Sequence, residues 1–395
     1  MRDEFGIELS MSRAGAFVIA VWDADNRQAG DTTIGTGVAR ARGWLRFLAG
    51  DRADASPRET GELRVYSRIG LQTRAKRIDK RLWHPKVAVI ILNWNGLEHT
   101  TECLESLKKI SYPNCEVIVV DNGSDGNDAE LLRQRFGSYI RLIENDTNYG
   151  FAGGSNIGIR YALHSAVPDY VLLLNNDTVV DPEFLGWMVK TAHVDPAIGI
   201  VGAEICHYDA PDRLWSVWDR MNFWIGRPLE TRQGTTERTE AKEGDSGAQP
   251  SPEMVDWATG CCLLIKKQVL EDIGLLDESY FIYWDDVEYC YRAKKAGCKT
   301  VYCSMAKVWH KVGKAAMGVP GFALYYGTRN RFWFMKEYAT RWQYRSFLIY
   351  FFADYFWRVA GGCVLHRRHP RTLVSFCRGI EDGLKNAKKV TGDPA

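Results

Sequence analysis

The sequence predicts an α/β fold in which a mostly parallel sheet carries helices on both faces. Five stretches rich in Val, Ile and Leu have the length of strands, and several of them end in Asn or Asp. Segments with apolar residues three or four positions apart, the spacing of one helical face, separate these stretches. Parallel strands that are covered on both faces have near-continuous apolar runs of this kind.

The elements follow one another in a regular alternation from Lys86 onward. We expect strands at residues 87–92, 116–121, 140–143, 170–174 and 199–205, and a last one at 298–303. We expect helices after residue 97, near 131–136, over 155–165 and over 289–296. A further helix should begin at Pro182, with Asp181 as its N-cap, because proline suits the first helical position.

Composition divides the chain into three parts. Residues 1–85 are rich in Arg, Gly and Asp with weak periodicity, and we expect an N-terminal extension of unknown structure. This extension could be an accessory domain, a partly disordered arm, or sequence upstream of the true start codon. Residues 86–315 form the α/β domain, in which the polar segment 229–253 is expected to be a mobile loop, either a lid or an inert insertion. Residues 316–395 are expected to be helical and basic.

Charge is distributed unevenly, although the 395 residues have the composition of a soluble globular protein. Residues 1–86 hold 16 Lys and Arg against 11 Asp and Glu, and residues 311–395 hold 15 against 5. The centre is therefore acidic, which suits a cation-dependent site. The basic, aromatic tail suits an anionic surface such as phospholipid headgroups or a phosphorylated acceptor. No nucleic-acid partner is expected.

Cysteine usage and the absence of a secretory signal predict a cytoplasmic location. The ten cysteines lack metal-type spacing, and most lie in apolar contexts, so we expect buried, reduced thiols. The apolar run Phe347–Phe352 is followed closely by the charged residues Asp354 and Arg358, so the apolar stretch is too short to span a membrane. It predicts either an interfacial helix, peripheral on the inner face of the plasma membrane, or a buried core helix.

Three polar clusters stand at predicted strand ends, where ligands bind in open α/β sheets. They are Asn93-Trp94-Asn95-Gly96, Asp121-Asn122-Gly123-Ser124-Asp125-Gly126 and Asn175-Asn176-Asp177. A carboxylate such as Asp121 can accept a hydrogen bond from a base or a ribose, and Asp177 offers an oxygen ligand to Mg²⁺. Each cluster alone could be a capped turn, but three together predict a nucleotide pocket with a metal.

A glycine-rich segment follows the third strand and opens a helix. It contains Asn148, Gly150, Phe151, Gly153, Gly154 and Asn156. Glycines allow a backbone to approach a phosphate at a helix N-terminus. The spacing differs from G-x-G-x-x-G, and a tight turn with close helix packing is the alternative.

Adjacent carboxylates and a late histidine complete the candidate residues. Asp285 and Asp286 should raise each other's pKa, and one of them could be the general base that an alcohol nucleophile requires. The alternative is that one of them caps the following helix. His310 should lie near the strand ends, where a neutral imidazole could complete a metal site.

Together, these motifs resemble those of the family 2 glycosyltransferases, and most closely those of the rhamnosyltransferase-like branch. The resemblance covers about residues 86–340, in the motif order of the family. It implies a GT-A fold, a nucleotide-sugar donor, Mg²⁺ or Mn²⁺, and inverting transfer to an acceptor hydroxyl. Asp286 would be the catalytic base with Asp285 beside it, and Asp177 and His310 would bind the metal. The implied donor-binding residues are Asn93, Trp94, Asn95, Asp121, Asn122, Asn148, Gly150, Phe151, Gly153, Gly154, Asn156, Asn175 and Asn176.

The sequence departs from the family pattern at two positions. Asn175 replaces the first acidic residue of the D-x-D metal motif, and Asp285 replaces the usual Glu beside the base. The resemblance favours dTDP-rhamnose as the donor and leaves UDP- and GDP-sugars open. The acceptor could be a lipid-linked glycan, a polysaccharide or a protein. The alternatives are a nucleotidyltransferase of related fold and a glycan-binding protein that has lost turnover.

Overall fold

The computed structural model describes residues 5–11, 17–23, 84–215, 218–230, 252–311, 321–365 and 370–385. The chain divides into two units, Met1–Arg77 and Ile78–Ala395. In the first unit, strands β1 (Phe5–Met11) and β2 (Phe17–Asp23) pair antiparallel. The remainder of the predicted N-terminal extension up to residue 83, and most of the loop predicted at 229–253, lie outside the described residues.

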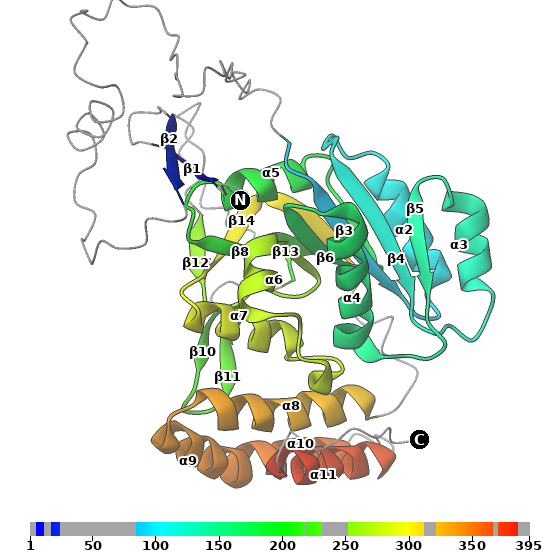
Figure 1. The fold of residues 1–395 in the computed structure, drawn as a ribbon. Helices are drawn as coiled ribbons and strands as arrows, with labels where there is room; N and C mark the ends of the chain where they lie inside the picture. The colour runs from blue at the N-terminus through cyan, green and yellow to red at the C-terminus, as the bar shows by residue number, and fades with distance from the viewer. Residues whose placement is uncertain are drawn as a thin grey trace, which may run out of the picture. The chain divides into compact units, whose positions relative to one another are not determined.

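One half of the sheet in the second unit is parallel (Figure 1). Its strands are β3 (Val87–Asn93), β4 (Cys115–Asp121), β5 (Ile140–Glu144) and β6 (Tyr170–Asn175). The helices that connect them are α2 (Leu97–Leu107), α3 (Asp128–Phe136) and α4 (Gly150–Tyr161). The strands lie in the order β6-β3-β4-β5, so the chain moves outward from β3 and then returns to its other side. The ends of β3 and β6 therefore flank a topological switch point, where ligands bind in such sheets.

The other half of the sheet is mixed. Its strands are β7 (Thr178–Val180), β8 (Ile198–His207), β9 (Ala210–Leu214), β12 (Glu253–Val255), β13 (Cys262–Lys266) and β14 (Lys299–His310). Strand β13 runs antiparallel to both β6 and β8, whereas β14 runs parallel to β8. The helical segments here are α5 (Phe184–Ala192), α6 (Lys267–Ile273), the 3-10 turn η3 (Glu278–Tyr280) and α7 (Asp285–Lys295).

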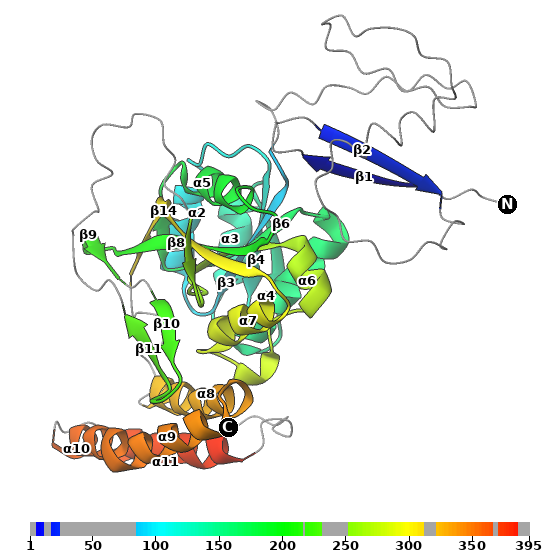
Figure 2. The ribbon, with the colours of Figure 1, turned by 90° about the vertical axis from the view of Figure 1, so that its left-hand side faces the viewer.

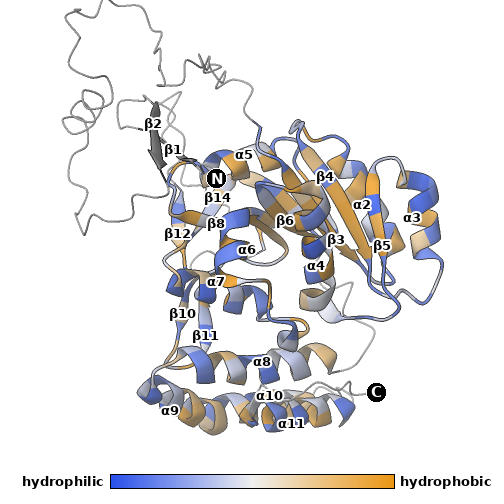
Figure 3. Ribbon diagram, in the orientation of Figure 1, coloured by the Kyte–Doolittle hydropathy of each residue, from blue (hydrophilic) through white to orange (hydrophobic). Residues whose placement is uncertain are grey.

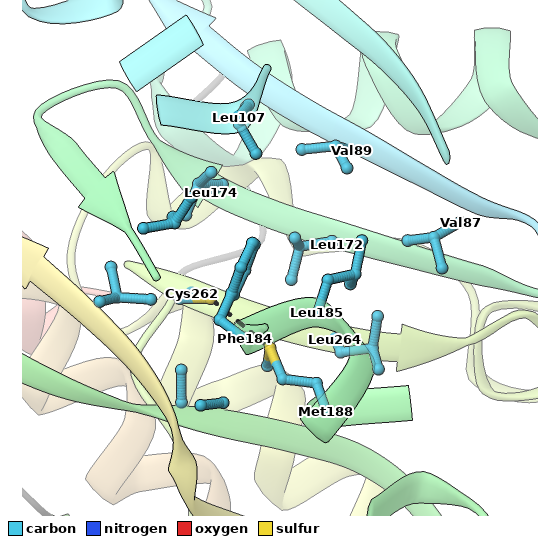
Figure 4. Close-up of a cluster of buried hydrophobic side chains, with 14 of the residues drawn as sticks. Val87, Val89, Leu107, Leu172, Leu174, Phe184, Leu185, Met188, Cys262 and Leu264 are labelled. Carbon is cyan, nitrogen blue, oxygen red and sulfur yellow. Dashed lines mark hydrogen bonds between the residues drawn. The ribbon is translucent and has the colours of Figure 1, made fainter. Parts of the chain in front are cut away.

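Alternating side chains of the central strands feed two apolar cores, one on each face of the sheet. Val87, Val89 and Ile91 belong to the core beneath α2 and α5, which Figure 4 shows with Phe184 and Met188. The intervening Ala88 and Ile90 belong to the core on the opposite face. Figure 3 shows the hydrophobic colouring that results in β4 and β6. The predicted α/β class with helices on both faces is confirmed.

A helical region and a hairpin complete the second unit. The helical segments are α8 (Phe322–Tyr338), α9 (Arg341–Tyr350), the π-helical turn η4 (Phe351–Tyr355), α10 (Phe356–Leu365) and α11 (Pro370–Leu384). Strands β10 (Trp218–Asn222) and β11 (Arg227–Glu230) form the hairpin. In both views, α8 lies between this hairpin and a layer of α9, α10 and α11 (Figures 1 and 2). No helix in the described residues has the length and apolar character needed to cross a membrane.

Three helix starts differ from the sequence predictions. Helix α5 begins at Phe184, two residues later than expected, and Asp181 instead accepts a bond from the Glu183 N–H at 2.8 Å. Helix α4 begins at Gly150, so its glycines form its first turns. Helix α7 has Trp284 as its N-cap residue, and the two aspartates are its first helical residues. The alternative in which one of them is the N-cap is therefore wrong.

Candidate active site

The ends of β3 and β4 are joined by a buried polar network. Asn93 Nδ2 donates to Asp121 Oδ1 at 2.6 Å, and it also lies 3.2 Å from Ser124 Oγ and 3.1 Å from Asp128 Oδ2. The Thr100 hydroxyl donates to Asn93 Oδ1 at 2.6 Å. Asn93 thus uses its amide to hold Asp121 in place. Thr100 and Asp128 were not singled out from the sequence, because their roles depend on contacts between separate elements, and Ser124 was included only as part of the cluster that follows the second strand.

The two residues after Asn93 have different surroundings. Asn95 has a positive φ of 51° and exchanges two hydrogen bonds of 2.8 Å with Asp125, which fixes the turn. Trp94 is 40% exposed. Asn95 is also exposed, but its amide is used within the turn, so Trp94 is the residue that offers an exposed aromatic surface to a ligand.

Asn122 connects the end of β4 to the glycine-rich segment. Its Nδ2 donates to Asn148 Oδ1 at 2.9 Å and to the Gly150 carbonyl at 3.1 Å. Gly150 has a φ of +73°, and a Cβ at this position would lie 2.5 Å from the Phe281 carbonyl oxygen. Only glycine fits this conformation and this close approach. The segment therefore meets the loop that precedes α7.

Of the remaining glycines, Gly154 allows helix α4 to approach β3, whereas Gly153 faces Tyr149, the N-cap residue of α4 itself. A Cβ at Gly154 would lie 2.4 Å from Leu92 Cδ1, and one at Gly153 would lie 2.9 Å from Tyr149 Cβ. Asn156 is buried and donates to the Leu276 carbonyl and to Glu278 Oε1, both at 2.9 Å. Its amide is thus committed to the segment before α7. A donor-binding role for these residues stays a prediction.

The two predicted metal ligands, Asp177 and His310, lie at the ends of β6 and β14. The buried Asp177 Oδ1 lies 3.1 Å from His310 Nε2 at the end of β14. Asn176 Nδ2 donates to Thr100 Oγ1 at 2.9 Å, which links this strand end to the Asn93 network. The backbone N–H of Asn175 donates to the Cys261 carbonyl at 2.9 Å.

Electrostatics favour a charged Asp177–His310 pair. Burial opposes ionisation of Asp177, but the hydrogen bond and charge of His310 outweigh it and lower the Asp177 pKa. Burial likewise opposes protonation of His310, but Cys261 and Asp177 raise the His310 pKa above its usual range. A divalent cation could take the place of this proton, because it would supply the same positive charge to the carboxylate.

A cation would need ligands beyond these two side chains. Within the described ranges, no group of three or more His, Cys, Asp or Glu is arranged to hold a metal. His310 Nδ1 is buried without a hydrogen-bond partner, and Asn175 is neutral. The residues fit a cation whose remaining ligands are phosphate oxygens of a substrate, which is a common arrangement for Mg²⁺.

Asp285 and Asp286 begin helix α7 in two different environments. Asp285 is 3% exposed, and its Oδ2 has no hydrogen-bond partner. Burial, and then the charge of Asp286, raise the pKa of Asp285 well above its ordinary value. Asp286 is partly exposed and accepts bonds from the Gly260 N–H at 2.9 Å and the Val287 N–H at 2.8 Å. Burial also raises the pKa of Asp286. A raised pKa suits a general base.

Gly260 and Cys261 join the aspartate pair to the strand end. Gly260 donates to Asp286, and the next residue, Cys261, accepts from Asn175. A Cβ at Gly260 would lie 3.3 Å from the Phe151 ring and 3.4 Å from Asp286 Cβ. The structure therefore brings the predicted clusters into one contact network around the switch point.

A strained loop before α7 is held by a residue that sequence reasoning did not place in the site. Phe281, Tyr283 and Trp284 all have positive φ angles, between 63° and 68°. Asn330 of α8 is fully buried, and its Nδ2 donates to the carbonyls of Tyr280, Ile282 and Tyr283 at 2.7–2.8 Å. In the sequence, the polar residues 328–331 interrupt the aromatic segment 325–334, and this interruption is the feature that could have indicated such a role.

Known proteins share this sequence pattern. The chain is 27% identical over 252 residues to a low-salt glycan biosynthesis hexosyltransferase, Agl10, of Haloferax volcanii, covering 62% of this chain and 74% of that protein. It is 25% identical over 272 residues to an N-acetylglucosaminyl-diphospho-decaprenol L-rhamnosyltransferase of Mycobacterium tuberculosis, covering 64% and 85%. A mannosyltransferase from Pyrobaculum calidifontis, solved with GDP-Man and Mn²⁺, aligns over 88% of this chain and 93% of its own. Its identity of 15% and TM-score of 0.47 are too low for a functional argument.

A family model described as glycosyltransferase-like family 2 matches residues 84–345. This match spans the whole sheet from β3 to β14, helix α8 and all the predicted site residues. The predicted resemblance to this family is confirmed, and the observed α/β sheet agrees with the fold that the resemblance implies. The chain therefore belongs to glycosyltransferase-like family 2.

Proposed function

We propose that this protein is an inverting glycosyltransferase that moves a sugar from a nucleotide-diphosphate sugar to an acceptor hydroxyl in glycan or polysaccharide synthesis. The observation that carries the proposal is the link between Asp286 and the end of β6. Two consecutive residues, Gly260 and Cys261, contact Asp286 on one side and Asn175 on the other. This arrangement supports a base and a diphosphate site that act on one substrate.

Asp286 is the candidate base for a single displacement. The acceptor oxygen forms a bond to the anomeric carbon while Asp286 accepts the hydroxyl proton. The bond between the anomeric carbon and the diphosphate oxygen breaks, and the nucleoside diphosphate leaves with that electron pair. Attack opposite the leaving group inverts the anomeric configuration, and one carboxylate is sufficient for this. The two backbone N–H groups bonded to Asp286 would fix its orientation.

The donor would lie across the ends of β3, β4 and β6. Asp121 is held by Asn93 and could accept a hydrogen bond from the nucleoside, and the exposed Trp94 ring could contact the base. Rhamnose carried by dTDP is the donor that we favour. The Mycobacterium tuberculosis relative is a rhamnosyltransferase by name, which supports the sugar.

Asp177 and His310 would hold Mg²⁺ or Mn²⁺ together with the donor diphosphate. The bound cation would neutralise charge on the leaving group. Because Asn175 is a weaker ligand than a carboxylate, we expect tight metal binding only when the donor is present.

A lipid-linked glycan is the acceptor that we favour. The name of the same relative specifies a sugar joined through diphosphate to decaprenol. A free polysaccharide or a protein acceptor would instead be revealed by transfer in the absence of lipid.

The test starts with a thermal-shift screen of dTDP-rhamnose and of UDP- and GDP-sugars, with and without Mn²⁺. The stabilising donor is then used to compare Asp286→Asn with the wild type. We expect transfer to fall by about 10²–10⁴-fold, because proton removal is lost, while donor binding is retained. The matched control is Asp272→Asn, which alters an exposed carboxylate on α6.

Three outcomes would contradict the proposal. Full activity of Asp286→Asn would remove the assigned base. Donor binding by the wild type without transfer or hydrolysis would favour the glycan-binding alternative. Release of diphosphate from a nucleoside triphosphate and a sugar phosphate would favour a nucleotidyltransferase.

A further inference from the structure

The outer layer of the C-terminal region contains a helix with two apolar sides. Segments α9, η4 and α10 run without interruption from Arg341 to Leu365. On one side, Phe347 and Phe351 are fully buried, and their rings lie 5.1 and 4.7 Å from the ring of Phe332 on α8. This side belongs to the protein core. The helix therefore already has a partner along one side and does not need a second one for folding.

The opposite side exposes large apolar residues to solvent. Trp342, Ile349 and Trp357 are 69%, 70% and 66% exposed, and Phe352 is 42% exposed. Trp342 and Ile349 are seven residues apart, which places them on one helical face. Phe352 and Trp357 are five residues apart across the π-helical turn, whose hydrogen bonds join residues five apart. Ile349 and Phe352 are three residues apart, which joins the two pairs. Together the four side chains form a single stripe, which we call the aromatic stripe, and Phe352 lies at its edge, with its ring 6.4 Å from that of Phe332.

Positive charges accompany the aromatic stripe. Arg341, Arg345 and Arg358 are all exposed, and the Arg345 guanidinium lies 5.0 Å from the Trp342 ring. Asp354 is the one acidic residue between 341 and 365, and it is paired with Arg358. Helix α11 lies in the same layer (Figures 1 and 2). The exposed surface of the helix from Arg341 to Leu365 is therefore both apolar and cationic.

We propose that the aromatic stripe and its arginines dock on the surface of an anionic lipid bilayer. A helix with an apolar face and basic flanks lies in the plane of the membrane interface. Trp rings favour the headgroup level, and Arg side chains can extend from apolar surroundings to phosphate groups. A second copy of the chain fits less well, because a two-fold contact places the same patch on itself and brings arginines together. The inference does not depend on the proposed transfer reaction.

Flotation of the full chain with vesicles tests this inference. The vesicles contain phosphatidylglycerol and phosphatidylcholine in equal parts, or phosphatidylcholine alone. We expect binding to the anionic vesicles that weakens as salt is added, because exposed charges are screened. Trp342→Ala/Trp357→Ala and Arg345→Glu/Arg358→Glu should each weaken binding by at least about tenfold.

The matched control reverses two exposed charges elsewhere, in Lys109→Glu/Arg141→Glu. It should bind nearly as well as the wild type, which separates a local patch from a general effect of net charge. All variants replace exposed side chains, and thermal unfolding verifies that they are folded. The inference is overturned by a lack of binding at low salt or by equal binding of the stripe variants. Sedimentation velocity that shows a dimer lost in Trp342→Ala/Trp357→Ala would identify a second copy as the partner instead.

Discussion

Asp285 and Asp286 show how neighbouring residues of one type can have different properties. The side chain of Asp286 is anchored by two backbone N–H groups and remains partly accessible. Asp285 is buried and has an oxygen without a partner, so its charged form is poorly solvated. The accessible member is the better candidate for contact with an acceptor. Burial and the charge of Asp286 both favour the protonated form of the buried member, Asp285.

The raised pKa of Asp285 predicts a pH-dependent stability. Between the unfolded and folded pKa values, the native state binds more protons than the unfolded state. The contribution of Asp285 to stability is therefore present below the unfolded pKa and is lost as pH rises toward the folded pKa. Asp285→Asn removes the ionisation and keeps the shape. We expect it to raise the Tm at neutral pH, by an amount that shrinks as pH falls to about 4.

Differential scanning fluorimetry across pH 4–8 gives this comparison directly. Asp272→Asn is the control, because its carboxylate is exposed on α6. A Tm difference for Asp285→Asn that is constant with pH would contradict the prediction, since it would show that ionisation of Asp285 is not responsible.

At the level of elements, the loop between η3 and α7 depends on helix α8. Positive φ angles at three non-glycine residues are costly, at about 1–3 kcal/mol each. Such a conformation persists only where surrounding contacts determine it. The Asn330 amide supplies two hydrogens to three loop carbonyls, and Arg329 donates to the carbonyls of Ser279 and Tyr280. Helix α8 thereby sets the position of the segment that ends at Asp285 and Asp286.

Asn330→Ala is expected to destabilise the domain by about 2–4 kcal/mol, because it removes the side-chain donor from the partly buried carbonyls of Ile282 and Tyr283 and leaves a void at a fully buried position. Asn330→Asp should have a similar effect, since it preserves the shape but not the donating group. Urea unfolding monitored by Trp fluorescence gives the free energy of unfolding. Transfer is then measured with the donor that the thermal-shift screen selects. The same variants should lower kcat more than they raise KM, because the loop positions the proposed base Asp286.

The control for this loop is Asn114→Ala, which removes one exposed hydrogen bond to the His84 carbonyl. It should change the free energy of unfolding by less than about 1 kcal/mol. A similarly small effect of Asn330→Ala would show that the loop conformation does not require its amide.

The sequence predicted the elements of the sheet better than the contacts between them. Strands from β3 to β6 could be predicted because their apolar runs and polar ends are local signals. The antiparallel direction of β13 could not, because direction depends on pairing with β6 and β8. The start of α4 was predicted too late, since its glycines suggested a loop. Asn330 was missed because its partners are backbone carbonyls 47–50 residues away.

At the level of the whole second unit, one apolar core extends from the sheet into the C-terminal helices. The core on the face that carries α4 also contains Phe332, Phe347, Phe351 and Phe376. The predicted alternatives for the segment at 347–352, a core helix or an interfacial helix, are therefore not exclusive. Its buried side is core, and the membrane role of its exposed side stays a proposal. The predicted domain boundary at residue 315 also stays a prediction.

Two neighbouring residues on α9 should separate folding from docking. Phe347 is fully buried against Phe332, and its ring lies 2.7 Å from the position that a Cβ on Gly226 would occupy. Phe347→Ala should lower the free energy of unfolding by about 3–5 kcal/mol, because it leaves a cavity where α8, α9 and the β10–β11 hairpin meet. Urea unfolding monitored by circular dichroism measures this loss.

Ile349→Ala, two residues away, is the matched control. Its side chain is 70% exposed, so it should change the free energy of unfolding by no more than about 0.5 kcal/mol. It should nevertheless weaken vesicle flotation, since it removes apolar surface from the aromatic stripe. Strong destabilisation by Ile349→Ala would place both sides of α9 in the core and would remove the basis for docking. A small effect of Phe347→Ala would instead show that the C-terminal helices are not part of the same folding unit as the sheet.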